Sequence, residues 1–196
     1  MSPFEYPAEP HQRRHGPTGY ADADSYRPWL RDEFSFRCVY CLKRETWTVR
    51  KGEFVVEHFL ALKWAAHRAL DYDNLLYACQ GCNLAKGDQS VPDPLRHLLS
   101  KSVVVADDGS IKAKTRDAQR LVKQLGLNDP IYCEYRRLMI DIIGLASAAD
   151  PSMLRRLMGA PIDWPDLSGL RPPKGNSRPE GIANSFFAQA RPKKPK

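Results

Sequence analysis

The segments Cys38-Val-Tyr-Cys41 and Cys79-Gln-Gly-Cys82-Asn83-Leu-Ala-Lys86-Gly87 decide the architecture of this chain. Each Cys-x-x-Cys motif presents two sulfurs from one tight turn, and two such motifs complete the tetrahedral set that a structural zinc ion requires. Thirty-seven residues separate the motifs, more than a minimal zinc ribbon needs. We therefore expect a structural Zn²⁺ on Cys38, Cys41, Cys79 and Cys82, which clamps the base of a larger loop.

Cysteine usage and hydropathy indicate the environment of the chain. The fifth cysteine, Cys133, lies alone in a predicted helix, where we expect a small buried apolar residue. Metal binding explains the other four better than disulfides do, which suits a reducing compartment. Residues 1–20 lack the apolar stretch of a secretory signal, and no apolar run is long enough to cross a bilayer. The sequence predicts a soluble, cytoplasmic protein with no membrane partner.

The positive charge of the chain is unevenly distributed. The formal net charge is +7, and residues 171–196 contain seven Lys or Arg residues and one Glu, a net charge of +6. The rest of the chain is therefore close to neutral. A basic, Pro-rich tail can hold nucleic acid through phosphate contacts, or it can be a solvated segment that keeps the protein soluble. The sequence leaves both interpretations open.

Local patterns predict an α+β fold with a small core and a helical extension. Residues 1–24 are rich in Pro, Gly, His and Arg without a sustained period, so we expect little fixed structure there. Around the two motifs the pattern predicts two short strands, a short helix, a third strand and a helix that Gly87 ends. These segments are residues 46–50, 54–56, 60–70, 75–77 and 79–86.

Beyond Pro94 the pattern predicts a hairpin followed by helices. Gly109 supplies the positive φ that the hairpin turn needs, Thr115 caps one helix, and Asp150-Pro151 begins another. On the helix after Pro130 we expect an inward apolar face made of Ile131, Tyr135, Leu138, Ile142 and Ile143. The expected divisions are a disordered segment at 1–24, a core at 25–92, the hairpin with its helical extension at 93–165, and a basic tail at 166–196.

Three polar side chains near the motifs form a chemical set. Glu57 and His58 are adjacent, and Asn83 follows Cys82 directly. A neutral imidazole near pH 7 can take a proton from water, while carboxylate and carboxamide oxygens suit a hard cation such as Mg²⁺. This inventory favours phosphodiester hydrolysis. Strand alternation alone would send Glu57 and His58 to opposite faces, so a bulge or the end of the strand would have to bring them together.

The order Cys-x-x-Cys, Glu-His, Asn, Cys-x-x-Cys-Asn-x-x-Lys resembles the HNH endonuclease family, specifically its zinc-knuckled members with a ββα-metal core. The resemblance covers residues 36–90. It implies that Glu57 binds the catalytic metal with Asn83, that His58 is the general base, and that Asn74 orients His58 by bonding the loop backbone. Lys86 would lie where it can contact a phosphate, helped by the positive end of its helix.

Plainer interpretations stand beside these roles. Asn74 could be a turn residue, Lys86 a solvated helix lysine, and His67 and His97 surface histidines. Many members of the family have a Pro after the His and a Gly-Gly turn before the Asn. Here residues 59–67 fill that loop with apolar and helix-forming residues, so the substrate-facing loop is unusual.

The leading hypothesis is a metal-dependent endonuclease that acts on DNA with Mg²⁺ or Mn²⁺. One alternative is a non-catalytic zinc-knuckle module that binds nucleic acid. Another is a nuclease subunit of a multiprotein anti-phage defence assembly, docked to a partner protein such as an ATPase. A large exposed apolar patch on the helices after Pro130 would favour this last hypothesis. The sequence does not distinguish DNA from RNA, nor nicking from double-strand cleavage.

Overall fold

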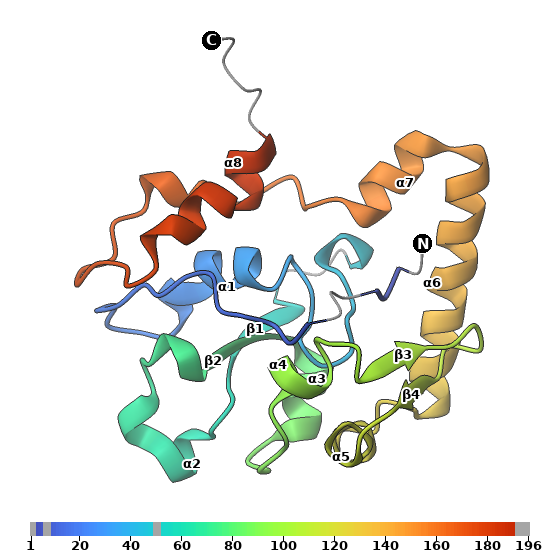
Figure 1. Cartoon of the computed structure of the whole chain (residues 1–196), viewed down its shortest axis with the longest axis horizontal. Coiled ribbons are helices and arrows are strands. Elements are labelled where there is room, and N and C mark those ends of the chain that lie inside the picture. Colours follow the sequence, from blue (N-terminus) through green and yellow to red (C-terminus); the bar gives the residue numbers. More distant parts are fainter. Residues whose placement is uncertain (1–2, 6–8, 49–51, 191–196) are drawn as a thin grey trace.

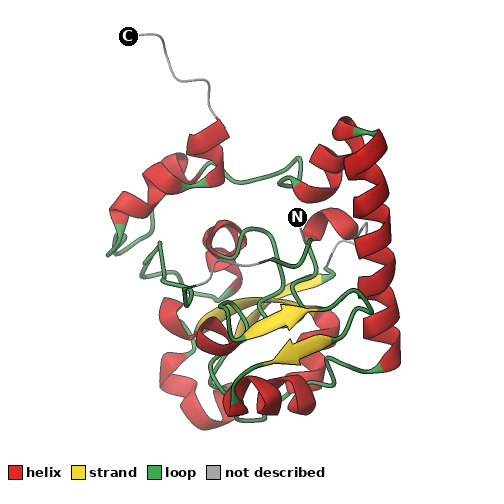
Figure 2. Ribbon diagram, turned by 45° about the vertical axis from the view of Figure 1, so that its right-hand side comes forward, coloured by secondary structure: helices red, strands yellow, loops and turns green. Residues whose placement is uncertain are grey.

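A computed structural model describes residues 3–5, 9–48 and 52–190 (Figure 1). The chain forms short strands surrounded by helices (Figure 2). The strands are β1 (Phe54–His58), β2 (Leu75–Cys79), β3 (Val103–Val105) and β4 (Ile111–Ala113). The α-helices are α1 (Arg27–Glu33), α2 (Leu62–Ala65), α3 (Gln80–Lys86), α4 (Pro94–His97), α5 (Arg116–Gln124), α6 (Pro130–Ala149), α7 (Pro151–Met158) and α8 (Phe186–Ala190). The 3-10 helices are Asp24–Tyr26, Glu45–Trp47, Ala66–Arg68, Tyr72–Asn74, Leu167–Gly169 and Pro179–Asn184.

A ββα unit forms the centre of the molecule. Strand β1 pairs antiparallel with β2, in a register that sets His58 opposite Leu75 and Glu57 opposite Leu76. All five residues of β2 are buried, which explains its continuous apolar sequence. Helix α3 follows β2 without a loop and ends at Gly87, whose φ of 48° suits glycine. The expected α+β class, with its zinc-knuckle ββα core, is confirmed.

Helix α1 supports this unit. Its Trp29 and Leu30 are fully buried, and Phe34 directly after it is 1% exposed. These large side chains belong to the same apolar cluster as β2 and the first cysteine motif. The backbone N–H of Val39, inside that motif, donates to the carbonyl of Tyr77 on β2. The first motif is therefore held against the strand that leads to the second.

The strand expected at residues 46–50 is not observed. Its first part belongs instead to the 3-10 helix Glu45–Trp47, where Thr46 Oγ1 and Trp47 Nε1 both donate to the carbonyl of Leu157. Residues 49–51 lie outside the described residues. β-propensity favoured a strand at this place, but contacts with a segment more than a hundred residues away decided the local conformation.

The N-terminal segment is ordered where the structure describes it, contrary to the expectation for residues 1–24. His15 is fully buried, and its Nε2 lies 2.9 Å from an oxygen of Asp32. His11 Nε2 lies 2.8 Å from Glu33, and both carboxylates are carried by α1. The histidines of this segment are thus partners of buried acids, a role that composition alone does not reveal.

Glu33 makes folding stability depend on pH. Burial by itself raises the pKa of its carboxyl group, but the hydrogen bond from His11, the charge of Arg13 and the backbone N–H of Arg14 outweigh burial and lower the pKa from 4.5 to about 2. Because the folded-state pKa is the lower one, the stabilisation is present above about pH 4.5 and is lost as the pH falls towards 2. A shift of this size corresponds to about 3 kcal/mol.

We therefore expect Glu33→Gln to lower the free energy of unfolding by about 3 kcal/mol at pH 7, with a difference that shrinks as the pH falls below 4. Urea unfolding of both proteins across this pH range measures it. Glu134→Gln is the control, since Glu134 is exposed and its salt-bridge partner among the described residues is Arg137 on its own helix. A Glu33→Gln penalty that stays constant down to pH 2.5 would contradict the assignment.

The C-terminal segment is also ordered in its described part, so residues 166–190 are not a free solvated tail, one of the two interpretations left open by the sequence. Residues 166–190 contain the helix Pro179–Asn184 and α8, and Asn176 forms an antiparallel bridge with Pro17 of the N-terminal segment. Arg178 pairs with Asp73 at 2.9 Å, so part of the basic charge is neutralised. The two terminal segments therefore lie side by side (Figure 1).

The hairpin and helices beyond Pro94 form as expected. Strands β3 and β4 pair antiparallel, Thr115 accepts a hydrogen bond from the N–H of Ala118, and Asp150 caps α7. The inward face of α6 agrees with the prediction in part. Ile143 is buried and Tyr135 and Ile142 pack half-buried against the core, while the other buried side chains are Arg136, Met139 and Ala146. Ile131, Leu138 and Leu145 are spaced by seven residues and are exposed to 74%, 52% and 71%. Arg136 takes a buried position because it bonds the carbonyls of Gly109 and Leu127.

Within the described residues, no helix combines the length and hydrophobicity needed to traverse a lipid bilayer.

Candidate active site and metal centre

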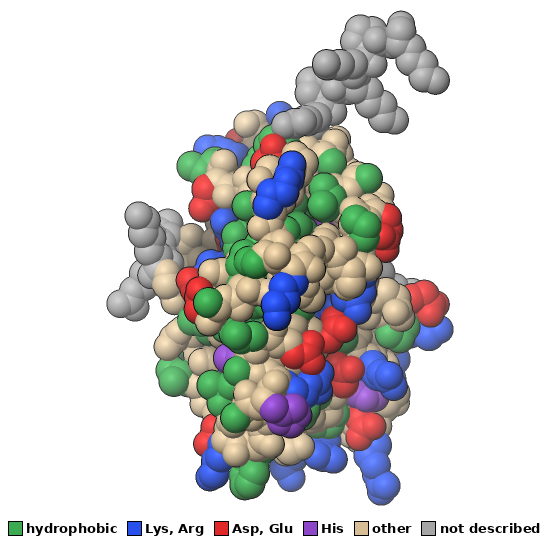
Figure 3. Space-filling model, turned by 90° about the vertical axis from the view of Figure 1, so that its left-hand side faces the viewer, with side chains coloured by type: hydrophobic (Ala, Val, Ile, Leu, Met, Phe, Trp, Pro, Cys, Tyr) green, Lys and Arg blue, Asp and Glu red, His purple; other side chains and the backbone are tan. Residues whose placement is uncertain are grey.

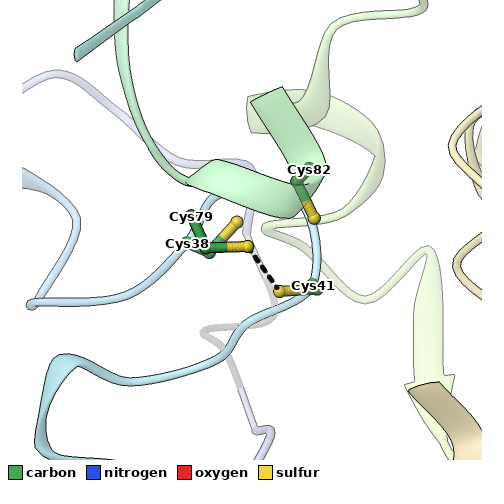
Figure 4. Close-up of side chains that lie close together, drawn as sticks. All are labelled: Cys38, Cys41, Cys79 and Cys82. Atoms are coloured by element: carbon green, nitrogen blue, oxygen red, sulfur yellow. Dashed lines mark hydrogen bonds between the residues drawn. The ribbon is translucent and has the colours of Figure 1, made fainter. Parts of the chain in front are cut away.

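The four motif cysteines converge on one point. Their sulfur atoms all lie within 4.8 Å of one another, and the sulfurs of Cys41 and Cys79 are 3.7 Å apart (Figure 4). Tetrahedral coordination with Zn–S bonds of about 2.3 Å requires sulfur separations of about 3.8 Å. In the described part of the chain, this is the one group of three or more His, Cys, Asp or Glu residues that could hold a metal ion.

Local hydrogen bonds hold the cysteines in this arrangement. The N–H of Cys38 donates to the carbonyl of Lys43, and the N–H of Tyr40 lies 3.4 Å from the Cys38 sulfur. Burial raises the pKa of the Cys38 thiol well above its ordinary value, so a thiolate there needs a cation beside it. The geometry and the chemistry of the four sulfurs both fit a structural zinc ion.

Glu57 lies in the interior and is fully engaged. Its side chain is 3% exposed, one carboxylate oxygen accepts a hydrogen bond from Tyr40 at 2.8 Å, and the other pairs with Lys86 at 2.6 Å. Burial raises the pKa of the Tyr40 hydroxyl, which therefore remains a donor at neutral pH. Each carboxylate oxygen thus already has one protein partner, and the metal-ligand role expected for Glu57 stays a prediction.

Lys86 also lies elsewhere than expected. The resemblance placed it at a substrate phosphate, yet its side chain is 1% exposed and its ammonium group pairs with Glu57 and donates to the carbonyl of His58. The physical reason is burial, because a carboxylate inside the core requires a cation next to it. Lys86 therefore joins α3 to the end of β1 through the backbone carbonyl of His58.

His58 is the half-buried last residue of β1. Its Nε2 lies 3.0 Å from the carbonyl oxygen of Ala69, in the loop between the two strands. A carbonyl only accepts, so the neutral imidazole carries its proton on Nε2 and leaves Nδ1 as an acceptor. Within the described residues Nδ1 has no hydrogen-bond partner. The side chain is oriented as a general base would need to be.

Asn74 stabilises the loop between β1 and β2 through side-chain hydrogen bonds. Its side chain is fully buried, its Oδ1 accepts from the N–H of Leu60 at 2.8 Å, and its Nδ2 donates to the carbonyls of Leu60 and Arg68. These bonds close the loop that carries Ala69, the partner of His58. They are bonds to the loop backbone of the kind expected for Asn74; its contribution to catalysis stays a prediction.

Asn83 lies in the first turn of α3, immediately after the zinc ligand Cys82. Its side chain is half-buried and makes no hydrogen bond to any described residue. The carboxamide is therefore open to a ligand, unlike that of Asn74. The structure thus leaves the Asn83 side chain and His58 Nδ1 without protein partners while it encloses Glu57.

Comparison with known proteins identifies this unit. Residues 38–89 match a family model described as HNH endonuclease. These residues form an HNH endonuclease domain. No curated protein matches the chain. The HNH domain begins at the first zinc ligand and ends just beyond α3, so it contains every residue of the candidate site.

The HNH domain indicates the general chemistry of this protein. HNH domains act on nucleic acids, and their nucleases use divalent metal ions. The expected relation to this family and to its zinc-knuckle subtype is confirmed by the matched residues and by the cysteine cluster.

Sequence reasoning missed one residue of the HNH domain. Tyr40 occupies a variable position of the first motif, and only its bond to Glu57 reveals its function. A buried acid implies donors around it, but the sequence does not say which residues supply them. Through Tyr40 the zinc knuckle contacts the residue next to His58.

Proposed function

We propose that this protein is a metal-dependent endonuclease that hydrolyses phosphodiester bonds in DNA. His58 Nδ1 is the general base that takes a proton from the attacking water. The observation that carries the proposal is the hydrogen bond from His58 Nε2 to the carbonyl of Ala69, because it directs the basic nitrogen away from the loop. The use of four cysteines for metal supports a cytoplasmic location.

The Asn83 carboxamide oxygen is the protein ligand best prepared for a divalent ion, Mg²⁺ or Mn²⁺. Such an ion, when bound, would stabilise negative charge on the leaving oxygen. Glu57 is the second proposed ligand. An ion bound there would share the carboxylate with Lys86, whose positive charge opposes a second cation.

We expect His58→Ala to lower the rate of plasmid cleavage by about 10²- to 10⁴-fold, the usual contribution of a general base. Purified protein is incubated with plasmid DNA and Mg²⁺ or Mn²⁺, and nicked and linear products are measured over time. His97→Ala is the matched control, because His97 lies in α4 and its nearest charged partner is Asp117.

Zinc content and circular dichroism establish that each variant is folded. Undiminished cutting by folded His58→Ala would remove His58 from the mechanism. If the wild-type protein binds DNA but does not cut it under any of these conditions, the binding-module alternative replaces the nuclease. A parallel series on RNA of the same sequence decides the substrate class.

The hypothesis of a subunit docked to a partner protein, in a defence assembly or elsewhere, draws support from α6. Its exposed residues Ile131, Leu138 and Leu145 share a seven-residue spacing that suits packing against another helix. The helix lies at the outer edge of the molecule (Figure 1) and outside residues 38–89. Docking there is compatible with catalysis.

A further inference from the structure

The HNH domain exposes several large apolar side chains. Of the eleven large hydrophobic residues exposed in the described part of the chain, five lie in the sequence between His58 and the end of α3. Two of them, Leu60 and Trp64, line the same cavity, and an exposed apolar surface of this kind points to a ligand or partner. The five are Leu60, Leu62, Trp64, Leu70 and Leu84.

Trp64 is held in place although it is 69% exposed. It belongs to α2, and its indole N–H donates to the carbonyl of Asp88, just beyond α3. The Lys63 ammonium lies 5.0 Å from the centre of its ring. The indole is therefore anchored by its edge next to a positive charge. On the face seen from the left of Figure 1, hydrophobic side chains lie among basic, acidic and histidine side chains (Figure 3).

A cavity of about 210 Å³ begins at the residue that follows His58. Its walls are mainly apolar, and a carboxamide and a hydroxyl supply polar groups. Phe59, the next residue along the chain after the candidate base, contributes to the wall, so the cavity begins one residue beyond His58. The lining residues are Phe59, Leu60, Ala61, Trp64, Gln89, Ser90 and Val91.

We propose that this cavity receives an unstacked nucleobase of the substrate, close to the bond that is cut, and that Trp64 is its stacking surface. The inference rests on the proposed nuclease function. A flat aromatic base matches an indole and aliphatic walls, and its polar edge can bond Gln89 and Ser90. Lys63 provides positive charge for the adjoining phosphate. The unusual apolar loop thus selects substrates with an unpaired or displaced base.

Binding of single-stranded oligonucleotides to catalytically silent protein tests this assignment. In a His58→Ala background, fluorescence anisotropy compares a thymidine 20-mer with a 20-mer of abasic nucleotides, which keeps the phosphates but lacks bases. We expect Trp64→Ala to weaken binding of the thymidine oligomer by roughly 5- to 100-fold, the range for a lost stacking residue. Binding of the abasic oligomer should not change.

Two further variants sharpen the comparison. Trp64→Phe should keep part of the affinity, because a smaller ring still stacks. Leu145→Ala is the matched control, since Leu145 is 71% exposed on α6, outside the HNH domain. The thymidine oligomer should also quench tryptophan fluorescence in protein that contains Trp64 and not in Trp64→Phe.

The outcomes separate this inference from the nuclease proposal. The nucleobase site is overturned if Trp64→Ala weakens binding of both oligomers equally, or changes binding of neither. Metal-dependent cutting by the wild-type protein would still support the nuclease proposal in that case. If the protein neither binds the oligomers nor cuts DNA, both proposals fail.

Discussion

We expect removal of Zn²⁺ from the four-cysteine site to unfold the HNH domain. A zinc ion held there would join the turn after α1 to the junction of β2 and α3, so four buried sulfurs would lose their common partner when it leaves. Structural zinc contributes about 10 kcal/mol or more to the folding of small metal-built domains, which is comparable with the whole stability of an ordinary domain. The expected effect is therefore loss of folded structure and of any nuclease activity together.

A strong chelator added during a circular-dichroism titration, with released zinc measured by a colour reagent, tests this expectation. Cys82→Ser should show the same loss without chelator. Cys133→Ser is the matched control, because Cys133 lies outside the metal cluster and should retain zinc and stability. A chelated protein that keeps its helical signal and melting temperature would show that the core does not depend on the metal.

Lys86→Met lowers the free energy of unfolding by about 3 to 5 kcal/mol, the usual result of removing one partner from a buried ion pair. The substitution keeps the length of the side chain but leaves the Glu57 carboxylate buried at 3% exposure with only the Tyr40 hydroxyl as partner. Urea unfolding of zinc-loaded protein at pH 7 measures the change. Lys63→Met, at an exposed lysine of α2, should stay within about 0.5 kcal/mol of wild type.

A double variant and a metal titration test the function of Glu57. The double variant Lys86→Met with Glu57→Gln should regain part of the lost stability, because the uncompensated charge is gone. If a divalent ion can take the place of Lys86 beside Glu57, millimolar Mn²⁺ should also stabilise Lys86→Met more than wild type. Stabilisation of the two proteins to the same extent would leave Glu57 with a purely structural function.

Local signals explain which elements could be predicted. The hairpin turn, the cap at Thr115 and the cap at Asp150 depend on neighbouring residues, and all three formed as expected. The N-terminal segment has no such local signal. It is ordered by hydrogen bonds from His11 and His15 to acids of α1, which composition does not reveal.

The error on α6 has a different cause. Its apolar residues extend over more than one face, so periodicity allowed several orientations of the helix. The buried face was selected by Arg136, whose guanidinium bonds two carbonyls, and Ile131 and Leu138 were left in solvent. The hydrogen bonds of Arg136 therefore determined which apolar residues of α6 are buried.

The sequence alone determined the four-cysteine cluster, the order of the ββα unit and the short strand that precedes His58, because each depends on residue type and spacing along the chain. Only the tertiary structure decided that Lys86 neutralises Glu57 and that Ala69 holds the His58 proton on Nε2. Those contacts join residues of separate elements inside a low-dielectric core, where a charge or a proton is placed by whichever partner the packing brings within reach.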